Sequence, residues 1–189
     1  MSLRVTVNKF LLRTIGAWTP PKRRLFGNLG NALRVLFAKG ICAKVGRHCN
    51  VEKGARINAG AVLEDYATIG VDALIDSGTI IHGHNLMAHG VQVFTHNHKY
   101  DLATHSFRGF EDVKPVHIGQ YTWIGVNVII LPGVTIGDHS IVGAGSVVTK
   151  SVPPGVMAAG NPCRVKKVID PAFAPRDLLT DSSRPFVES

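Results

Sequence analysis

The chain contains 189 residues and carries a formal net charge of +8. All of the excess charge lies in residues 1–40, which hold eight basic and no acidic side chains, whereas the rest holds thirteen of each sign. A nucleic-acid-binding protein needs a basic face on a recognition fold, and the neutral remainder provides none, so we expect no nucleic-acid partner. No apolar run approaches the ~20 residues of a transmembrane helix, and no secretory cleavage pattern is visible. The three cysteines lack zinc-site spacing, so we expect a cytoplasmic protein with one structural domain and appendages.

Residues 1–40 divide at Pro20-Pro21 into two segments that mix apolar and basic side chains. In the second segment Leu29, Leu33 and Leu36 recur at helical spacing. One interpretation is a helical cap over the open end of the repeat region that follows, because repeat folds need capped ends. The other is a basic amphipathic arm that contacts the inner face of an anionic membrane peripherally. The sequence leaves both open.

Most of the remaining chain follows a six-residue period. The marked positions all carry large apolar side chains, and they are Val45, Val51, Ile57, Leu63, Ile69, Ile75, Ile81, Met87, Val93, Ile118, Ile124, Ile130, Ile136, Val142 and Val148. Four residues after most marks stands a small or uncharged side chain, such as Cys49, Ala55 or Thr122. Residues two apart in a strand share a face, so large and small side chains alternate along one narrow interior. The pattern predicts short parallel strands stacked into an all-β solenoid.

The period breaks between Val93 and Ile118, which are twenty-five residues apart instead of twenty-four. The chain therefore leaves the solenoid and re-enters with its register reset, and we expect a protruding loop at about 99–116. A long loop inside so regular a fold usually carries function. Residues 170–189 show no period and contain three prolines, which predicts a loosely held C-terminal tail.

Glycine follows the marked residue at several positions. These pairs include Ile69-Gly70, Ile118-Gly119, Ile124-Gly125, Ile136-Gly137 and the run Val142–Ser146. With them the chain resembles the hexapeptide-repeat acyltransferases, whose fold is a left-handed parallel β-helix, against the usual right-handed crossover. In that family three hexapeptides form one triangular coil, so fifteen repeats imply about five coils within residues 41–169.

Three further stretches narrow the resemblance. They are Thr95–Asp101 at the break, Tyr121–Gly125 where the period resumes, and Val147–Gly155 with Ala158–Val165 near the end. Together they look like the galactoside/maltose, capsular polysaccharide and streptogramin O-acetyltransferases. The resemblance implies an acetyl-CoA-dependent enzyme without a metal that acetylates a hydroxyl of a sugar, or of an exopolysaccharide, capsule or O-antigen precursor. It also implies a homotrimer with active sites between subunits.

In this family the histidine at the start of the protruding loop is the general base, and His98 matches it within Asn97-His98-Lys99. An imidazole can take a proton from an acceptor hydroxyl and return one to the leaving thiolate, because its ordinary pKa lies near neutrality. His96 is the competitor, since it points to the same side of an extended segment. We predict His98 as the base, with His96 and Asn97 beside the acceptor and loop residues such as Phe110 selecting it.

Asn85 and Asn97 fall at positions where the period expects small interior side chains. A buried amide that finds no partner costs ~1–3 kcal/mol. The resemblance places Asn85 against the acceptor, and an internal pairing of the amide is the alternative.

The resemblance assigns further residues to the mouth and the coenzyme side of the site. Trp123 would contact the acceptor or the pantetheine, and the Gly125-Val126 backbone would donate an N–H to the oxyanion. Backbone groups near Ala144 would meet the pantetheine arm, Thr149 and Lys150 would lie near the adenosine end, and Arg164 and Lys167 would contact the phosphates. The cofactor-binding residues expected are therefore Gly125, Val126, Ala144, Thr149, Lys150, Arg164 and Lys167. Lys167 stands where arginine is common in the family.

Nine histidines allow another interpretation, a γ-class carbonic anhydrase-like zinc enzyme on the same fold. His48, His84 and His89 have suggestive spacing, but His48 and His84 share one phase two coils apart, ~9.6 Å by the rung spacing. A shared zinc ion would therefore need ligands from different chains. An N-acetyltransferase of an amino sugar would use the same residues as the O-acetyltransferase. A non-catalytic scaffold is a further alternative, although it has no need of all three stretches.

Overall fold

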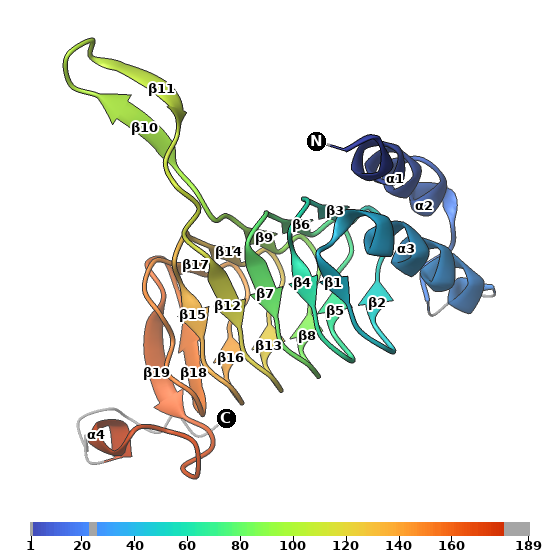
Figure 1. Ribbon diagram of the computed structural model, residues 1–189. Coiled ribbons are helices and arrows are strands. Elements are labelled where there is room, and N and C mark those ends of the chain that lie inside the picture. Colours follow the sequence, from blue (N-terminus) through green and yellow to red (C-terminus); the bar gives the residue numbers. More distant parts are fainter. Residues whose placement is uncertain (1, 23–25, 180–189) are drawn as a thin grey trace.

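The computed structural model describes residues 2–22 and 26–179 (Figure 1). Three helices come first, α1 (Leu3–Arg13), α2 (Ile15–Trp18) and α3 (Gly27–Ile41). α3 lies at the open end of the following solenoid, where Phe37, Ala38 and Ile41 join the buried core. The predicted helical cap is therefore confirmed, and its last helix ends one residue past the expected boundary. Within the described ranges, no helix combines the length and apolar character needed to cross a bilayer.

Short strands then wind around three faces of a prism (Figure 1). Face 1 contains β1 (Lys44–Val45), β4 (Val62–Leu63), β7 (Thr79–Ile81), β12 (Val116–Ile118) and β15 (Thr135–Ile136). Face 2 contains β2 (Asn50–Val51), β5 (Thr68–Ile69), β8 (Leu86–Met87), β13 (Trp123–Ile124), β16 (Ile141–Val142) and β18 (Val156–Ala159). Face 3 contains β3 (Arg56–Ile57), β6 (Leu74–Ile75), β9 (Gln92–Val93), β14 (Ile129–Ile130) and β17 (Val147–Val148). The paired strands of each face run parallel, and on face 2 β2 and β5 form a ladder separate from that of β8 to β18. The predicted parallel solenoid is therefore confirmed.

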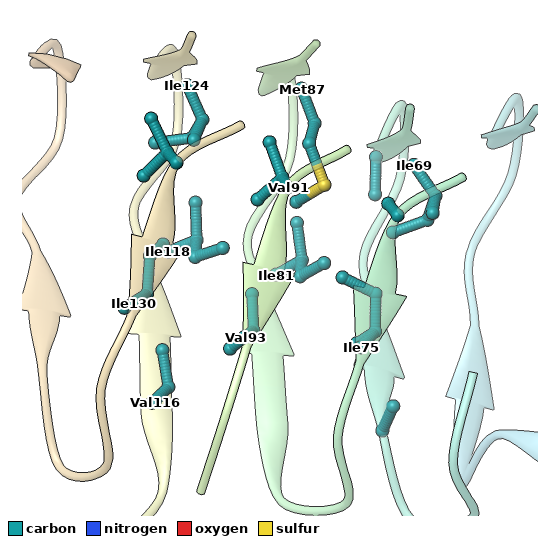
Figure 2. Packing of buried hydrophobic residues seen from close by; sticks show 14 of the residues in the cluster. Ile69, Ile75, Ile81, Met87, Val91, Val93, Val116, Ile118, Ile124 and Ile130 are labelled. Atoms are coloured by element: carbon teal, nitrogen blue, oxygen red, sulfur yellow. The ribbon is translucent and has the colours of Figure 1, made fainter. Parts of the chain in front are cut away.

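The marked residues of the six-residue period form the core. Fourteen of the fifteen are at most 3% exposed, and the other, Val45, is partly buried in the first coil. Figure 2 shows Ile69, Ile75 and Ile81 pointing from successive strands into the interior. Burying one such side chain stabilises the fold by ~1.5–3 kcal/mol, so the repeated row supplies most of the driving force for the solenoid.

The solenoid has five full coils and most of a sixth, so the expectation of about five was slightly low. Val152 bridges to Ile136 and Ala158 pairs with Val142, each sixteen residues after its partner. A regular coil has eighteen residues, as in the step from Val45 to Leu63. The last coil is therefore two residues shorter than a regular one. Its apolar residues fall outside the six-residue period, so the sequence pattern did not reveal this coil.

The predicted protruding loop is a β-hairpin that extends away from the prism (Figure 1). Its strands are β10 (His98–Asp101) and β11 (Ser106–Phe110), paired antiparallel. The chain re-enters face 1 at Val116, which pairs with Thr79 and is fully buried. Val116 thus fills the interior position, and the sequence-based placement of Asn97 in the interior is wrong, because Asn97 is exposed at the base of the hairpin.

The chain ends on the last coil. β19 (Arg164–Val168) pairs antiparallel with β18, and α4 (Arg176–Leu179) follows. Phe173 stacks on His139 with ring centroids 3.8 Å apart, and Ala174 and Leu178 pack against the core. Residues 170–179 are thus held more firmly than the sequence indicated, and the rest of the expected tail lies outside the described residues.

Candidate active site

His98 opens the hairpin with one ring nitrogen already engaged. Its Nδ1 lies 3.2 Å from the carbonyl oxygen of Gly109, which can only accept, so Nδ1 carries the hydrogen and Nε2 is left as the basic atom. The ring also packs on Phe110 at 4.5 Å between centroids. The hairpin therefore orients His98 as a general base requires.

His96 lies beside it with a different partner. Its Nδ1 is 3.0 Å from Oδ2 of Asp76, a side chain at the end of β6 in the preceding coil. His96 also contacts Phe110, edge to face at 4.7 Å between centroids. The structure thus brings His96, His98 and Phe110 together, and places the exposed Asn97 between the two histidines.

Asn85 is buried inside the solenoid, with only 3% of its surface exposed. Its Oδ1 accepts from the backbone N–H of Thr68 at 2.9 Å, and its Nδ2 donates to the Thr68 carbonyl at 3.1 Å. These bonds join β5 and β8, which belong to different main-chain ladders on face 2. The amide therefore substitutes for missing strand pairing, and its predicted contact with the acceptor remains a prediction.

Trp123 stands on the outer surface of face 2, half exposed, between Leu86 and Ile141 on the neighbouring strands. It lines a groove of about 630 Å³ with Leu86, His89 and Val126. The size and apolar lining suit a bound small molecule.

Gly125, Val126 and Ala144 lie together on the edge where face 2 turns into face 3. The N–H of Gly125 donates to the Val142 carbonyl at 2.8 Å, so it is not free to donate to the oxyanion as predicted. A side chain on Gly125 would collide with Ala144 in the next coil, which explains the glycine by packing. Val126 is exposed and carries the remaining candidate N–H.

The other predicted coenzyme residues divide between two places. Thr149 and Lys150 are exposed just after β17, on the edge between face 3 and face 1 from which the hairpin also projects. Arg164 and Lys167 lie on β19, which extends face 2. Arg164 Nη1 donates to the Cys163 carbonyl at 2.8 Å.

The predicted site is therefore split along face 3. His96, His98, Thr149 and Lys150 lie along one edge of that face, whereas Trp123, Val126 and Ala144 lie along or beyond the other. A face of about four extended residues is roughly 13 Å wide. Reacting atoms must approach to roughly 3–3.5 Å, so one chain does not bring the base and the oxyanion donor together.

Two of the histidines suggested for zinc, His48 and His84, lie on the third edge, in a stacked row of rings, whereas His89 lies in the groove beside Trp123. Tyr66 separates His48 from His84, with centroid distances of 4.9 and 4.5 Å. The row continues through Tyr121 and His139. His48 and His84 each face an aromatic ring, which disfavours the zinc interpretation within one chain. Across residues 2–22 and 26–179, no three His, Cys, Asp or Glu side chains gather as a potential metal site.

Sequence reasoning missed Asp76, the carboxylate behind His96. One signal was available, because Asn58 and Asp76 each directly follow a marked apolar residue in successive coils. Polar residues at the same phase of neighbouring coils stack, and Asn58 Nδ2 indeed donates to Asp76 Oδ1 at 2.9 Å.

Comparisons with known proteins agree with this geometry. The bacterial transferase hexapeptide family (six repeats) matches residues 115–150. A galactoside O-acetyltransferase from Lactococcus lactis subsp. lactis (strain IL1403) is 36% identical over 143 residues, which are 70% of this chain and 66% of that protein. Relatives from Staphylococcus aureus are 52% identical over 79 residues, and the chain spans only 39% of the length of such a relative.

Solved structures extend the likeness over most of the chain. A galactoside acetyltransferase in complex with coenzyme A has a TM-score of 0.57 and 27% identity, covering 90% of this chain and 84% of that one. A maltose O-acetyltransferase from Clostridium difficile 630 has a TM-score of 0.63 and 32% identity, covering 88% of this chain and 87% of that one. The chain therefore belongs to the hexapeptide-repeat acetyltransferases, and its solenoid is their left-handed β-helix.

Proposed function

We propose that the protein transfers the acetyl group of acetyl-CoA to a hydroxyl of a sugar, or of an exopolysaccharide, capsule or O-antigen precursor. The observation that carries this proposal is the orientation of His98, whose Nδ1 is held by Gly109 so that Nε2 is free to act as a base. Relatives named galactoside and maltose O-acetyltransferase support the choice of acceptor, and the galactoside acetyltransferase solved in complex with coenzyme A supports the donor.

The reaction begins when His98 Nε2 takes the proton of the acceptor hydroxyl. The oxygen attacks the thioester carbonyl, and the Val126 N–H donates to the developing oxyanion. The carbon–sulfur bond then breaks, and the imidazolium returns its proton to the departing thiolate. The same residues would serve N-acetylation if the acceptor were an amino sugar, since an amine also loses a proton during the transfer.

The split of the site along face 3 supports a homotrimer with active sites between subunits. His98 of one protomer would meet Trp123 and Val126 of the next, and coenzyme A would lie between them toward Ala144, Arg164 and Lys167. Thr149 and Lys150 would contribute to the adenosine end from the His98 side.

A mixing experiment tests the shared site. His98→Ala and Trp123→Ala proteins are each expected to be nearly inactive, but unfolding and reassembling them together should restore activity. Random assembly leaves about one quarter of head-to-tail interfaces with both residues intact. No restoration, with normal co-assembly shown by native mass spectrometry, contradicts a site shared between chains.

The base is tested by thiol release from acetyl-CoA with methyl β-galactoside or maltose as acceptor. His98→Ala should lower kcat by ~10²–10⁴ while acetyl-CoA affinity stays close to wild type. His105→Ala, at the exposed tip of the same hairpin, is the matched control and should keep full turnover. Full turnover in His98→Ala would remove the proposed mechanism.

We also propose that the N-terminal helices bind an anionic membrane surface, which would bring the enzyme close to a lipid-linked glycan acceptor. Phe10, Trp18 and Phe26 are 64%, 91% and 72% exposed. Residues 1–40 contain eight basic and no acidic side chains, and of these basic side chains Arg34 is fully buried. Exposed aromatics with basic neighbours suit the interface of anionic lipids. Salt-sensitive cosedimentation with phosphatidylglycerol vesicles should weaken in Trp18→Ala but not in Phe107→Ala, and equal binding of both variants would argue against this contact.

A further inference from the structure

Two imidazoles lie against the same side chain at the start of the hairpin. The rings of His96 and His98 have centroids 4.7 and 4.5 Å from the ring of Phe110. Their own centroids are therefore no more than about 9 Å apart, the sum of those two distances. The proposed mechanism uses only His98, so the imidazole of His96 has no assigned role in it.

His96 is held by a buried carboxylate that has no capacity for a ligand. Asp76 is 5% exposed. Its Oδ1 accepts from Asn58 Nδ2 and the Ser77 N–H, both at 2.9 Å. Its Oδ2 faces His96 Nδ1 at 3.0 Å and accepts from the Thr95 N–H at 3.4 Å. A carboxylate offers about four lone-pair sites, and here all four face protein donors.

The same contacts determine which nitrogen of His96 carries the hydrogen. Burial alone raises the pKa of Asp76, but the hydrogen bonds from Asn58, Ser77 and Thr95 and the nearby His96 together hold it below its usual range. An ionised carboxylate only accepts, so Nδ1 of His96 donates to it. Nε2 is then left as an acceptor in the neutral ring. A quarter of the His96 side chain is exposed, so a ligand can reach it where it cannot reach Asp76.

We propose that His96, positioned by Asp76, is a second acceptor-binding imidazole that accepts a hydrogen bond from a hydroxyl neighbouring the one acetylated. This inference rests on the proposed O-acetyl transfer and specifies its substrate as a diol. His98 removes the proton of one hydroxyl, and His96 holds the other in place. Phe110 supports both rings and sets their spacing.

The positioning network reaches the N-terminal helices. Lys9 Nζ on α1 donates to Asn58 Oδ1 at 2.9 Å, and Asn58 donates to Asp76. Asn58 therefore links the Lys9 ammonium to the Asp76 carboxylate through two hydrogen bonds. A helix outside the solenoid thus helps to maintain the carboxylate that orients His96.

Paired changes in substrate and enzyme test the proposal. The probes are methyl β-galactoside and its four monodeoxy derivatives, assayed by thiol release with wild type, His96→Leu and the hairpin control His105→Leu. The derivative lacking the reacting hydroxyl should be inactive. One derivative lacking an adjacent hydroxyl should lose about 2- to 12-fold in kcat/KM with wild type, the value of one hydrogen bond. That loss should vanish in His96→Leu and persist in His105→Leu.

A second variant tests the role of Asp76. In Asp76→Asn an amide can donate to His96 Nδ1, which moves the imidazole hydrogen to Nε2 and removes the acceptor. Asp76→Asn should therefore raise the KM for the galactoside as His96→Leu does, with little change in acetyl-CoA affinity. The double variant should be no worse than His96→Leu alone, whereas a purely structural role of Asp76 would give additive losses.

The outcomes separate this inference from the proposed function. If wild type turns over but the deoxy penalty is the same in His96→Leu, the diol contact is refuted while O-acetyl transfer stands. Additive losses in the double variant refute positioning through Asp76. If wild type releases no thiol with any hexoside or with maltose, the proposed acceptor class fails and the inference fails with it.

Discussion

Replacing Asn85 by leucine separates a structural from an acceptor-binding role for this amide. The substitution leaves the Thr68 N–H and carbonyl without partners inside face 2, because Asn85 provides both bonds. Each buried backbone group without a partner costs ~1–3 kcal/mol, and the apolar side chain returns about 1–2 kcal/mol. We expect a net loss of about 2–4 kcal/mol. In a chain of this length each kcal/mol lowers Tm by about 2–4 °C, so Tm should fall by about 5–15 °C.

The assay is thermal unfolding followed by circular dichroism at fixed protein concentration, since oligomers unfold in a concentration-dependent way. Asn85→Asp is the matched variant of nearly equal volume. One of its oxygens would still accept from Thr68, but the other would face the Thr68 carbonyl, so a similar loss is expected. An unchanged Tm in both variants, combined with a tenfold rise in acceptor KM, would refute the structural role and support the acceptor contact.

Two further predictions follow from buried ionisable groups. Burial raises the pKa of the Cys42 thiol to about 12 and also raises those of Cys49 and Cys163. Thiolates are the reactive form, so native protein at pH 8 should react with Ellman's reagent only slowly and yield three thiols per chain once unfolded; one fast thiol would contradict this. The lowered pKa of Asp76 contributes stability above its unfolded value near 4 that is lost as pH falls through the folded value. The Tm difference between wild type and Asp76→Asn should therefore shrink below about pH 4, and a constant difference would contradict it.

The solenoid fold was predictable because every coil repeats the same pattern of large and small interior side chains. Residues such as Ile75 and Ile81 alternate with small side chains along the interior, and a period shared by fifteen positions leaves one consistent register. The sixth coil escaped this reasoning because two residues are missing before Val152. The protruding loop was predicted, but its β-hairpin form was not, because the pairing of His98 with Phe110 depends on where the chain re-enters face 1, which the local pattern does not contain.

The candidate site was only partly predictable for a related reason. Family motifs pointed to His98 and Trp123, but which hydrogen-bonding groups are already engaged is a property of the assembled coils. Gly125 matches the motif, yet its N–H is committed to Val142. Asp76 matches no motif that we quoted, yet it determines the orientation of His96. Both contacts join neighbouring coils, which the local sequence pattern does not reveal.

Buried polar side chains identify the candidate functional positions of this solenoid. Burying a polar side chain costs free energy unless partners replace the lost water, so a fold built on repeated aliphatic residues tolerates such a side chain only where partners are arranged. Asn85 has the Thr68 backbone, and Asp76 has four protein donors. The first is fully occupied in holding two coils together. The second lies behind the partly exposed imidazole of His96 at the base of the hairpin. The partners of Asp76 therefore position a group that a ligand can reach, and this difference marks Asp76 and His96 as the pair to test for acceptor binding.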